Sequence, residues 1–257
     1  MTPGLILPRD PHLNIMIHAF IFTYKGNALQ AIESALAVQQ TLPEAHVSLI
    51  DDSNNPWTPE ALAKAKEAGV EYRTSDFNRR GNLNGHSAVV GILETLIQDK
   101  PDENDLLIKI DADTAVIGDS FIQPLLEDPE LSYSFCGSKW HVAHGCAYVI
   151  RAKVAYTMLE ALQGFELPPK SPEDIVIGDF AISRFQGRVF SAWSYLFWTS
   201  RWTAWNWDPK TTAKFYAEHF DVITTGNPCG KANPDEARAE VIRNLREEKK
   251  KLLQKIS

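Results

Sequence analysis

Two aspartates separated by a single residue, Asp111 and Asp113, have the spacing of a cation site. They follow an apolar run, Leu106–Ile110, that predicts a buried strand. Ligands of α/β proteins bind at the carboxyl ends of such strands. Two carboxylates there would repel each other unless a cation lay between them, and hard oxygen ligands suit Mg²⁺ or Mn²⁺. The pair therefore indicates a divalent ion that holds a diphosphate, although Asp also serves as a cap in strand-to-helix turns.

The residues before Asp111 alternate between strand-like and helix-like patterns. In chain order the pattern predicts strand 13–21, helix 28–40, strand 47–50, helix 59–68, strand 70–73, a helix over 88–96 and strand 106–110. This alternation is typical of an open, mainly parallel sheet with right-handed crossovers, which would bring the strand ends together at one edge.

The pattern changes after Asp113. It predicts a short helix at 121–126, strands at 133–136 and 145–150, a helix over 152–162, a proline-bearing loop at 165–172, a helix from 173 to about 184, a late strand at 189–193 and a charged helix from 233.

Composition narrows the class of protein. The chain has 257 residues, of which 44% are hydrophobic and 23% charged, as in an ordinary globular protein. The net charge of −7 gives no indication of general nucleic-acid binding. No apolar run approaches the roughly 18 to 20 residues of a membrane span, and residues 1–12 lack the basic region of a signal peptide. The three cysteines, an odd number at unremarkable spacing, argue against a disulfide framework and for a reducing compartment. A cytoplasmic location is therefore expected.

Several motifs together resemble the nucleotide-diphospho-sugar glycosyltransferases of the GT-A fold. The first strand leads into the polar loop Phe22–Tyr24, the second ends in Asp51–Ser53, and the Asp-x-Asp motif Asp111–Asp113 follows the fourth. Downstream, Gly145–Ile150 and Pro172–Gly178 resemble the Gly-rich Tyr-Val strand and the Glu-Asp-Val-x-x-Gly motif of β-1,3-glycosyltransferase-like enzymes of the Fringe and core-1 type.

The resemblance implies an α/β GT-A fold, with a mixed, mainly parallel sheet flanked by helices. One catalytic domain would span 1–232, with a nucleotide-binding half at about 13–115 and an acceptor half at about 116–232, before the charged helix 233–257. The implied activity is metal-dependent transfer of a sugar from a nucleoside diphosphate, with UDP favoured, to a hydroxyl group, with inversion at the sugar.

The resemblance also implies which side chains bind the donor. These are Thr23, Tyr24, Asp51, Asp52, Arg80, Asn84 and Asp111. A carboxylate of the Asp51–Asp52 pair would accept from a uracil or ribose hydroxyl, and Arg80 could grip the diphosphate with both arms of its guanidinium. Ordinary turn chemistry for the aspartates and a solvated loop charge for the arginine remain the alternatives.

The metal ion, Mn²⁺ or Mg²⁺, would be held by carboxylate oxygens of the Asp-x-Asp motif. By resemblance, Asp111 contacts the ribose or reaches the metal through water, and Asp113 binds the metal directly. A third ligand is expected from the C-terminal region. His219 is the candidate, although a lone histidine more often lies at the surface or in the core.

Inverting transfer needs a base for the acceptor hydroxyl, within hydrogen-bond reach of it. By resemblance this base is Asp174, with Glu173 in reserve. The same two acids are also typical of an ordinary helix start after Ser171, where they would interact favourably with the helix dipole. The two interpretations are compatible.

Aromatic residues crowd the segment 193–207, which contains five of the seven tryptophans. Trp198, Trp202 and Trp205 are candidate acceptor contacts, because aromatic faces stack on sugar rings, and His144 is a further candidate. Core packing is the alternative for the tryptophans. The acceptor could be a glycan, a lipid-linked sugar, a protein or a small molecule.

Other interpretations stay open at this point. The C-terminal helix could contact anionic lipid weakly through Lys249–Lys251, or be simply solvated. A haloacid-dehalogenase-like phosphatase also carries Asp-x-Asp after a strand, but Ala115 stands where that family has Thr or Val. A non-catalytic protein that only binds a sugar nucleotide is the third alternative.

Overall fold

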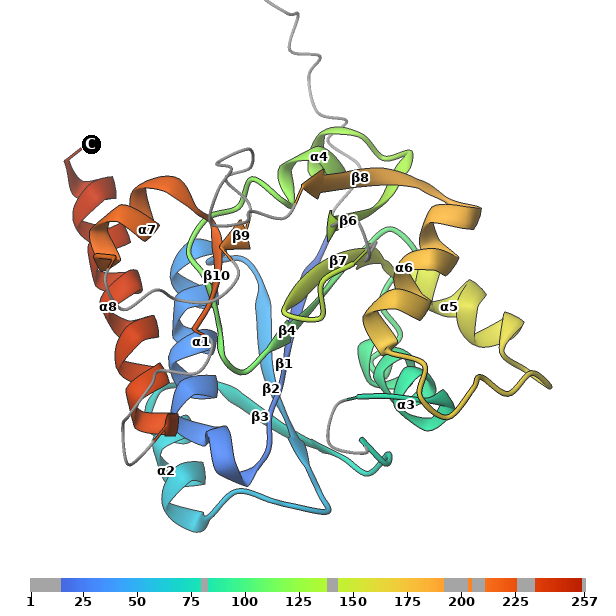
Figure 1. Ribbon diagram of the computed structural model, residues 1–257, viewed down its shortest axis with the longest axis horizontal. Coiled ribbons are helices and arrows are strands. Elements are labelled where there is room, and N and C mark those ends of the chain that lie inside the picture. Colours follow the sequence, from blue (N-terminus) through green and yellow to red (C-terminus); the bar gives the residue numbers. More distant parts are fainter. Residues whose placement is uncertain are drawn as a thin grey trace, which may run out of the picture.

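A seven-stranded sheet forms the centre of the molecule (Figure 1). The computed structural model describes residues 15–79, 83–137, 143–191, 203–204, 211–225 and 234–255. In spatial order the strands are β3 (Glu71–Ser75), β2 (His46–Asp52), β1 (Ile17–Phe22), β4 (Leu106–Asp111), β7 (Ala147–Arg151), β6 (Leu131–Gly137) and β8 (Gln186–Ser191). Strand β7 runs antiparallel to both its neighbours, and the other pairings are parallel. The predicted α/β class, with a mixed and mainly parallel sheet flanked by helices, is confirmed.

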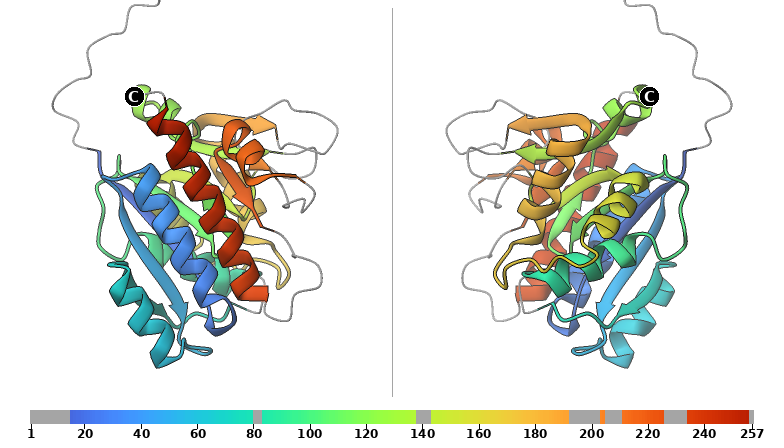
Figure 2. Two further views of the ribbon diagram at one scale, coloured as in Figure 1. Left: turned by 90° about the vertical axis from the view of Figure 1, so that its left-hand side faces the viewer. Right: turned by 90° about the vertical axis from the view of Figure 1, so that its right-hand side faces the viewer.

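Helices cover both faces of this sheet (Figures 1 and 2). On one side lie α1 (Ala28–Thr41), α2 (Pro59–Glu67) and α8 (Pro234–Gln254), and on the other α3 (His86–Leu96), α5 (Ala152–Ala161) and α6 (Glu173–Arg184). The helix predicted over 59–68 is confirmed: the Thr58 hydroxyl accepts from the amide of Ala61, and Pro59 takes the first helical position. A short helix, α4 (Gln123–Glu127), precedes β6.

A second, smaller sheet begins directly after the Asp-x-Asp motif. It consists of β5 (Thr114–Val116), β10 (Val222–Thr224) and β9 (Thr203–Ala204), and α7 (Ala213–His219) leads into β10. The sequence pattern did not predict these strands, because segments of two or three residues are too short to show an alternation. The small sheet fixes the turn after β4, since the amide of Thr225 donates to the carbonyl of Asp113 at 2.9 Å.

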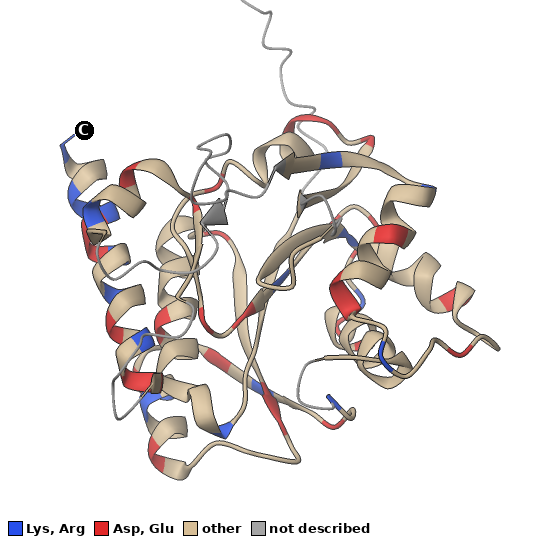
Figure 3. Cartoon of the chain, viewed as in Figure 1, with Lys and Arg blue, Asp and Glu red and all other residues tan. Residues whose placement is uncertain are grey.

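The C-terminal helix α8 packs along α1 over much of its length, as the left view of Figure 2 shows. Its apolar side, Ala237, Ala239, Ile242 and Leu245, is buried. Acidic and basic residues are interspersed along the length of α8 (Figure 3). The possible weak contact of Lys249–Lys251 with anionic lipid gains no support from the structure, in which the ammonium nitrogen of Lys249 lies 3.8 Å from Asp221 Oδ1 and that of Lys251 lies 2.6 Å from Glu248 Oε1.

Ion pairs and a cap join α8 to α1. The side chain of Glu33 lies between Arg243 and Arg246, with nitrogen–oxygen distances of 2.8 and 3.1 Å. At the other end, Asp235 accepts from the backbone amides of Leu29 and Gln30 at 3.0 and 2.9 Å. These amides belong to the first turn of α1 and would otherwise lack a helical acceptor. A residue 206 positions further along the chain therefore caps the first long helix.

None of the helices in the described ranges is long and apolar enough to cross a membrane. Cys136 and Cys146 are both buried.

The cap can be tested with Asp235→Ala. We expect a loss of about 1–2 kcal/mol in the free energy of unfolding, measured by urea denaturation, because the backbone amides of Leu29 and Gln30 lose their acceptor. Asp235→Asn keeps one carbonyl oxygen and should lose less. Equal stability of the alanine variant and the parent would contradict the capping role.

Candidate active site

A cleft of about 1320 Å³ opens where the order of the strands reverses, between β1 and β4. Its lining comes from the ends of β1 and β2, the loop after β3, the β4–β5 turn, the start of α6 and Arg238 of α8. Phe22, the last residue of β1, stands beside Asp111, the last residue of β4. Ligands of open α/β sheets bind at such a switch point.

The two aspartates of the motif both face this cleft. Asp111 ends β4 with its side chain 38% exposed, and Asp113 lies in the turn that follows, partly buried. Burial and the nearby charge of Asp111 raise the pKa of Asp113 to about 6, and Arg238 works in the opposite direction. Two carboxylates in this relation are a donor set for a hard divalent cation.

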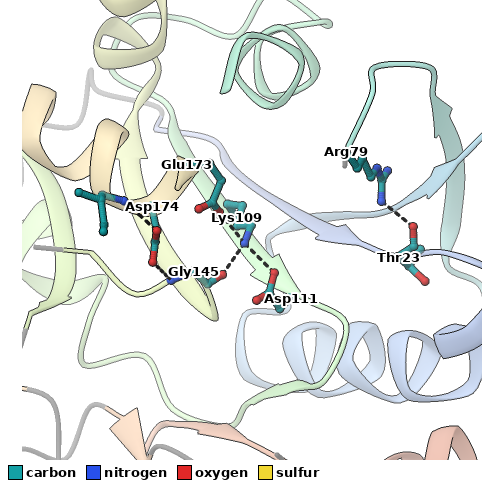
Figure 4. Close-up of polar contacts among 8 residues, drawn as sticks. Thr23, Arg79, Lys109, Asp111, Gly145, Glu173 and Asp174 are labelled. Atoms are coloured by element: carbon teal, nitrogen blue, oxygen red, sulfur yellow. Dashed lines mark hydrogen bonds and ion pairs between the residues drawn. The ribbon is translucent and has the colours of Figure 1, made fainter. Parts of the chain in front are cut away.

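A lysine that the sequence analysis passed over lies beneath them. Lys109 is on β4, two residues before Asp111 and therefore on the same face of the strand, with its side chain 1% exposed. Its ammonium group lies 2.6 Å from Asp111 Oδ1 and 2.8 Å from Glu173 Oε1, and it also donates to the carbonyl of Gly145 (Figure 4). Burial alone would lower the pKa of Lys109, but Asp111 and Glu173 raise it above its usual value.

The two acids at the start of α6 differ in their surroundings. Glu173 is buried and bound to Lys109, whereas Asp174 is partly exposed in the cleft. Asp174 accepts from the amides of Gly145 at 3.1 Å and Ile175 at 2.8 Å (Figure 4). Burial raises the pKa of Glu173 to about 7, against the effect of Lys109.

Charge is unevenly distributed in the cleft. Among the described residues that line it, six carry a carboxyl group and three carry a basic group. The basic side chains are Arg79, Lys109 and Arg238. Arg79 and Lys109 are already bonded to protein oxygens. A diphosphate entering this cleft would therefore meet excess negative charge, which a divalent ion can offset.

The opposite end of the cleft, below β2 and β3, is rich in polar side chains. Asp52, Asn54, Asn55, Asp76 and Asn78 line it. The exposed ring of Tyr24 also belongs to this end. Carboxylates, amides and an aromatic face are suited to a base and a ribose. Asp52 and Tyr24, both predicted to bind the donor, are thus in the cleft.

Thr23 and Asp51 were predicted to contact the donor as well, but both are fully buried and neither lines the cleft. The Thr23 hydroxyl donates to Asn27 Oδ1 at 2.6 Å and accepts from the indole N–H of Trp57 at 3.1 Å. The burial of both residues corrects this prediction. Thr23 instead stabilises the loop after β1 from inside the protein.

Asp51 has its own set of protein partners. It accepts from the Tyr72 hydroxyl at 2.6 Å and from the amides of Trp57 and Asp52 at 2.8 and 2.9 Å. Burial and Asp51 together raise the pKa of Tyr72, which keeps its hydroxyl protonated as a donor. Asp51 thus fixes the end of β2, while its neighbour Asp52 turns to the cleft.

Arg79 joins the ends of three strands from beneath the cleft. It donates to the carbonyl of Thr23 at 2.6 Å (Figure 4), to the carbonyl of Ile50 at 2.9 Å and to the Ser75 hydroxyl at 2.7 Å. Its neighbour Arg80, the predicted diphosphate contact, lies outside the described residues. The role of Arg79 could be predicted only from the path of the loop after β3, which no local sequence pattern indicates.

Asn84, another predicted donor contact, pairs instead with the segment that leads into α6. It forms a bridge with Pro172, and the amide of Gly85 donates to Ser171 at 2.7 Å. Gly85 has a φ of 85°, and a Cβ there would lie 2.7 Å from the carbonyl oxygen of Pro169. Only glycine fits this close approach. The loop therefore braces the start of α6.

Two further candidates, His219 and His144, are not among the described residues that line the cleft. His219 stacks on Phe215 at 4.4 Å, and its Nδ1 is 2.8 Å from the carbonyl oxygen of Phe215. Within the described ranges no cluster of three or more metal-binding side chains occurs, so His219 as a third metal ligand is not supported. His144 is buried and does not line the cleft. Trp198, Trp202 and Trp205 lie outside the described residues.

Comparison with known proteins gives fold-level likeness only. No protein-family model matches the sequence, and no curated protein matches it. Among solved structures, the galactosyltransferase LgtC with donor and acceptor sugar analogs matches at 14% identity and TM-score 0.49, over 90% of this chain and 95% of that one. Mannosyltransferase PcManGT from Pyrobaculum calidifontis, in complex with GDP-Man and Mn²⁺, matches at 16% identity and TM-score 0.49, over 96% and 73%.

A third structure has a different activity in its name. It is the 4-diphosphocytidyl-2C-methyl-D-erythritol synthase from Anaerococcus prevotii, with 13% identity and TM-score 0.48 over 69% of this chain and 87% of that one. Likeness of this size does not carry the donor, the acceptor or the metal of these enzymes over to this chain.

The burial of Glu173 can be tested through pH. Its pKa in the folded chain is raised above the ordinary value of 4.5, so its protonated form stabilises the fold, and this contribution is lost as pH rises through about 7. We expect Glu173→Gln to show a smaller fall in Tm between pH 5 and pH 8 than the parent. A parallel fall in both proteins would mean that Glu173 ionises normally.

Proposed function

We propose that this protein transfers a sugar from a nucleoside diphosphate donor to a hydroxyl acceptor, with Mn²⁺ or Mg²⁺ bound at Asp111 and Asp113. The observation that carries the proposal is one continuous cleft at the switch point. The Asp-x-Asp pair lies between a polar end suited to a nucleoside and the carboxylate of Asp174.

The donor binds with its base and ribose at the end formed by Asp52, Asn54 and Asp76, and with its diphosphate towards Asp113. Tyr24 offers a face for the base. Arg238 of α8 lines the cleft near Asp113, whose pKa its charge lowers, so it supplies positive charge from the C-terminal helix. UDP is the first nucleotide to test, because the sequence motifs favour it.

The metal fits the donor set available. Asp111 and Asp113 offer oxygen ligands, and diphosphate oxygens and water would complete the shell, as is usual for Mg²⁺. When bound, the ion would stabilise the negative charge that develops on the leaving diphosphate. Asp111 keeps one oxygen for this role, since Lys109 is bonded to Oδ1.

Asp174 is the proposed base. The acceptor oxygen attacks the anomeric carbon, the bond from that carbon to the diphosphate oxygen breaks, and Asp174 takes the proton of the acceptor hydroxyl. Asp174 lines the cleft, and two backbone amides fix its carboxylate. Glu173, the reserve candidate, is buried and its Oε1 is paired with Lys109, so it is less accessible to an acceptor hydroxyl than Asp174.

The alternatives are less well supported. A haloacid-dehalogenase-like phosphatase would use Asp111 as a nucleophile, but Ala115 stands where that family has Thr or Val. A non-catalytic sugar-nucleotide-binding protein would have no need for Asp174 to face the same cleft. Both remain outcomes of the experiments below.

Calorimetry of UDP and GDP, each with and without Mn²⁺, tests the donor site. We expect nucleotide binding to tighten at least about tenfold with the metal, because the ion bridges protein and diphosphate. Asp113→Asn should abolish this gain, whereas Asp179→Asn, on the exposed side of α6, should keep it. Binding that ignores the metal in the parent would sink the transferase proposal.

Asp174→Asn tests the base. We expect unchanged nucleotide affinity and a loss of transfer of about 10²–10⁴-fold, the range of general base catalysis, measured as release of nucleoside diphosphate across a panel of sugar donors and acceptors. Asp179→Asn is again the matched control, since it makes the same change on the same helix. Full turnover by Asp174→Asn would remove this residue from the mechanism.

A further inference from the structure

Lys109 is connected to both sides of the cleft. It lies on the central strand β4 and has no room to move, with 1% of its side chain exposed and the Tyr148 ring centroid 5.8 Å from its ammonium nitrogen. An ammonium group has three hydrogens. This group donates hydrogen bonds to Asp111 on the donor side and to the carbonyl of Gly145, and it forms an ion pair with Glu173 at the first position of α6.

Lys109 is connected to the proposed base, Asp174, by two separate routes, one through Glu173 and one through Gly145. Glu173 precedes Asp174 in the chain, so its anchorage fixes the first turn of α6. Gly145 forms the second route, because its carbonyl accepts from Lys109 and its amide donates to Asp174 Oδ2 at 3.1 Å (Figure 4). The backbone carbonyl and amide of Gly145 thus connect the ammonium group of Lys109 to the carboxylate of Asp174.

We propose that Lys109 is a positioning residue that sets the place of Asp174 relative to Asp111, and hence the acceptor hydroxyl relative to the donor. The proposal rests on the proposed function. Lys109 does not touch substrate in this role, because its buried ammonium group is held by Asp111, Glu173 and the carbonyl of Gly145. It joins strand β4, which carries the metal-binding motif, to helix α6, which carries the base.

If the Lys109–Glu173 ion pair only stabilised the fold, removing both of its charges would not lower kcat. Buried ion pairs contribute little net stability compared with apolar pairs of the same shape, but removing one partner leaves the other charge uncompensated. Lys109→Met alone would leave Glu173 buried without its cation, and that variant can fail to fold. The double variant Lys109→Met/Glu173→Gln removes both charges and is the variant to assay.

The test is a cycle of the parent, Lys109→Met, Glu173→Gln and the double variant, with transfer, nucleotide affinity and urea unfolding measured for each. Lys250→Met, on the exposed surface of α8, is the control for loss of a lysine charge. We expect the double variant to be more stable than Lys109→Met, to keep its Mn²⁺–UDP affinity within about threefold, and to lose about 10- to 100-fold in kcat, the cost of a small misplacement of reacting groups.

The outcomes separate this proposal from the one on which it rests. A parent protein without metal-dependent nucleotide binding or transfer would refute the proposed function itself. An active parent together with a folded double variant whose kcat is within about threefold of it would overturn the role of Lys109. A loss confined to nucleotide affinity would also overturn it, because Lys109 would then serve only Asp111.

Discussion

The geometry of the cleft depends on one buried positive charge. Taking a carboxylate out of water is expensive unless a partner compensates it, and Glu173 is buried among other acids. The ammonium group of Lys109 is that partner, and it simultaneously bonds Asp111. Moving α6 away from β4 would therefore take the buried carboxylate of Glu173 away from its cation. The arrangement penalises displacement, even if its net contribution to the free energy of unfolding is small.

Local patterns in the sequence were sufficient for the main framework. The strand that ends at Asp111 and the helix that begins at Thr58 with Pro59 both carry signals within a few residues of each other, and both are present. The strands of the small sheet escaped prediction, because two or three residues show no period and their pairing joins residue 114 to residue 224. Pairings of that separation leave no trace in a local window.

The candidate site shows the same limit at the scale of single side chains. Successive residues of a strand point to opposite faces, so of Asp51 and Asp52 one had to face inward. The sequence did not say which, and the structure has Asp51 inside with Tyr72 and Asp52 in the cleft. Lys109 did carry a signal, since a lysine within an apolar strand must find buried partners. Arg238 had none, because its place depends on how α8 packs on α1.

The cap that Asp235 provides for α1 has a consequence for biosynthesis. A ribosome releases the first half of the chain long before residue 235 has been made, so the amides of Leu29 and Gln30 wait in water for their acceptor. Gln30 itself lines the cleft, as do Tyr24 and Asn27 just before that turn. A nascent chain can thus form its strands early, but it acquires a finished binding surface only after its last helix has emerged and docked.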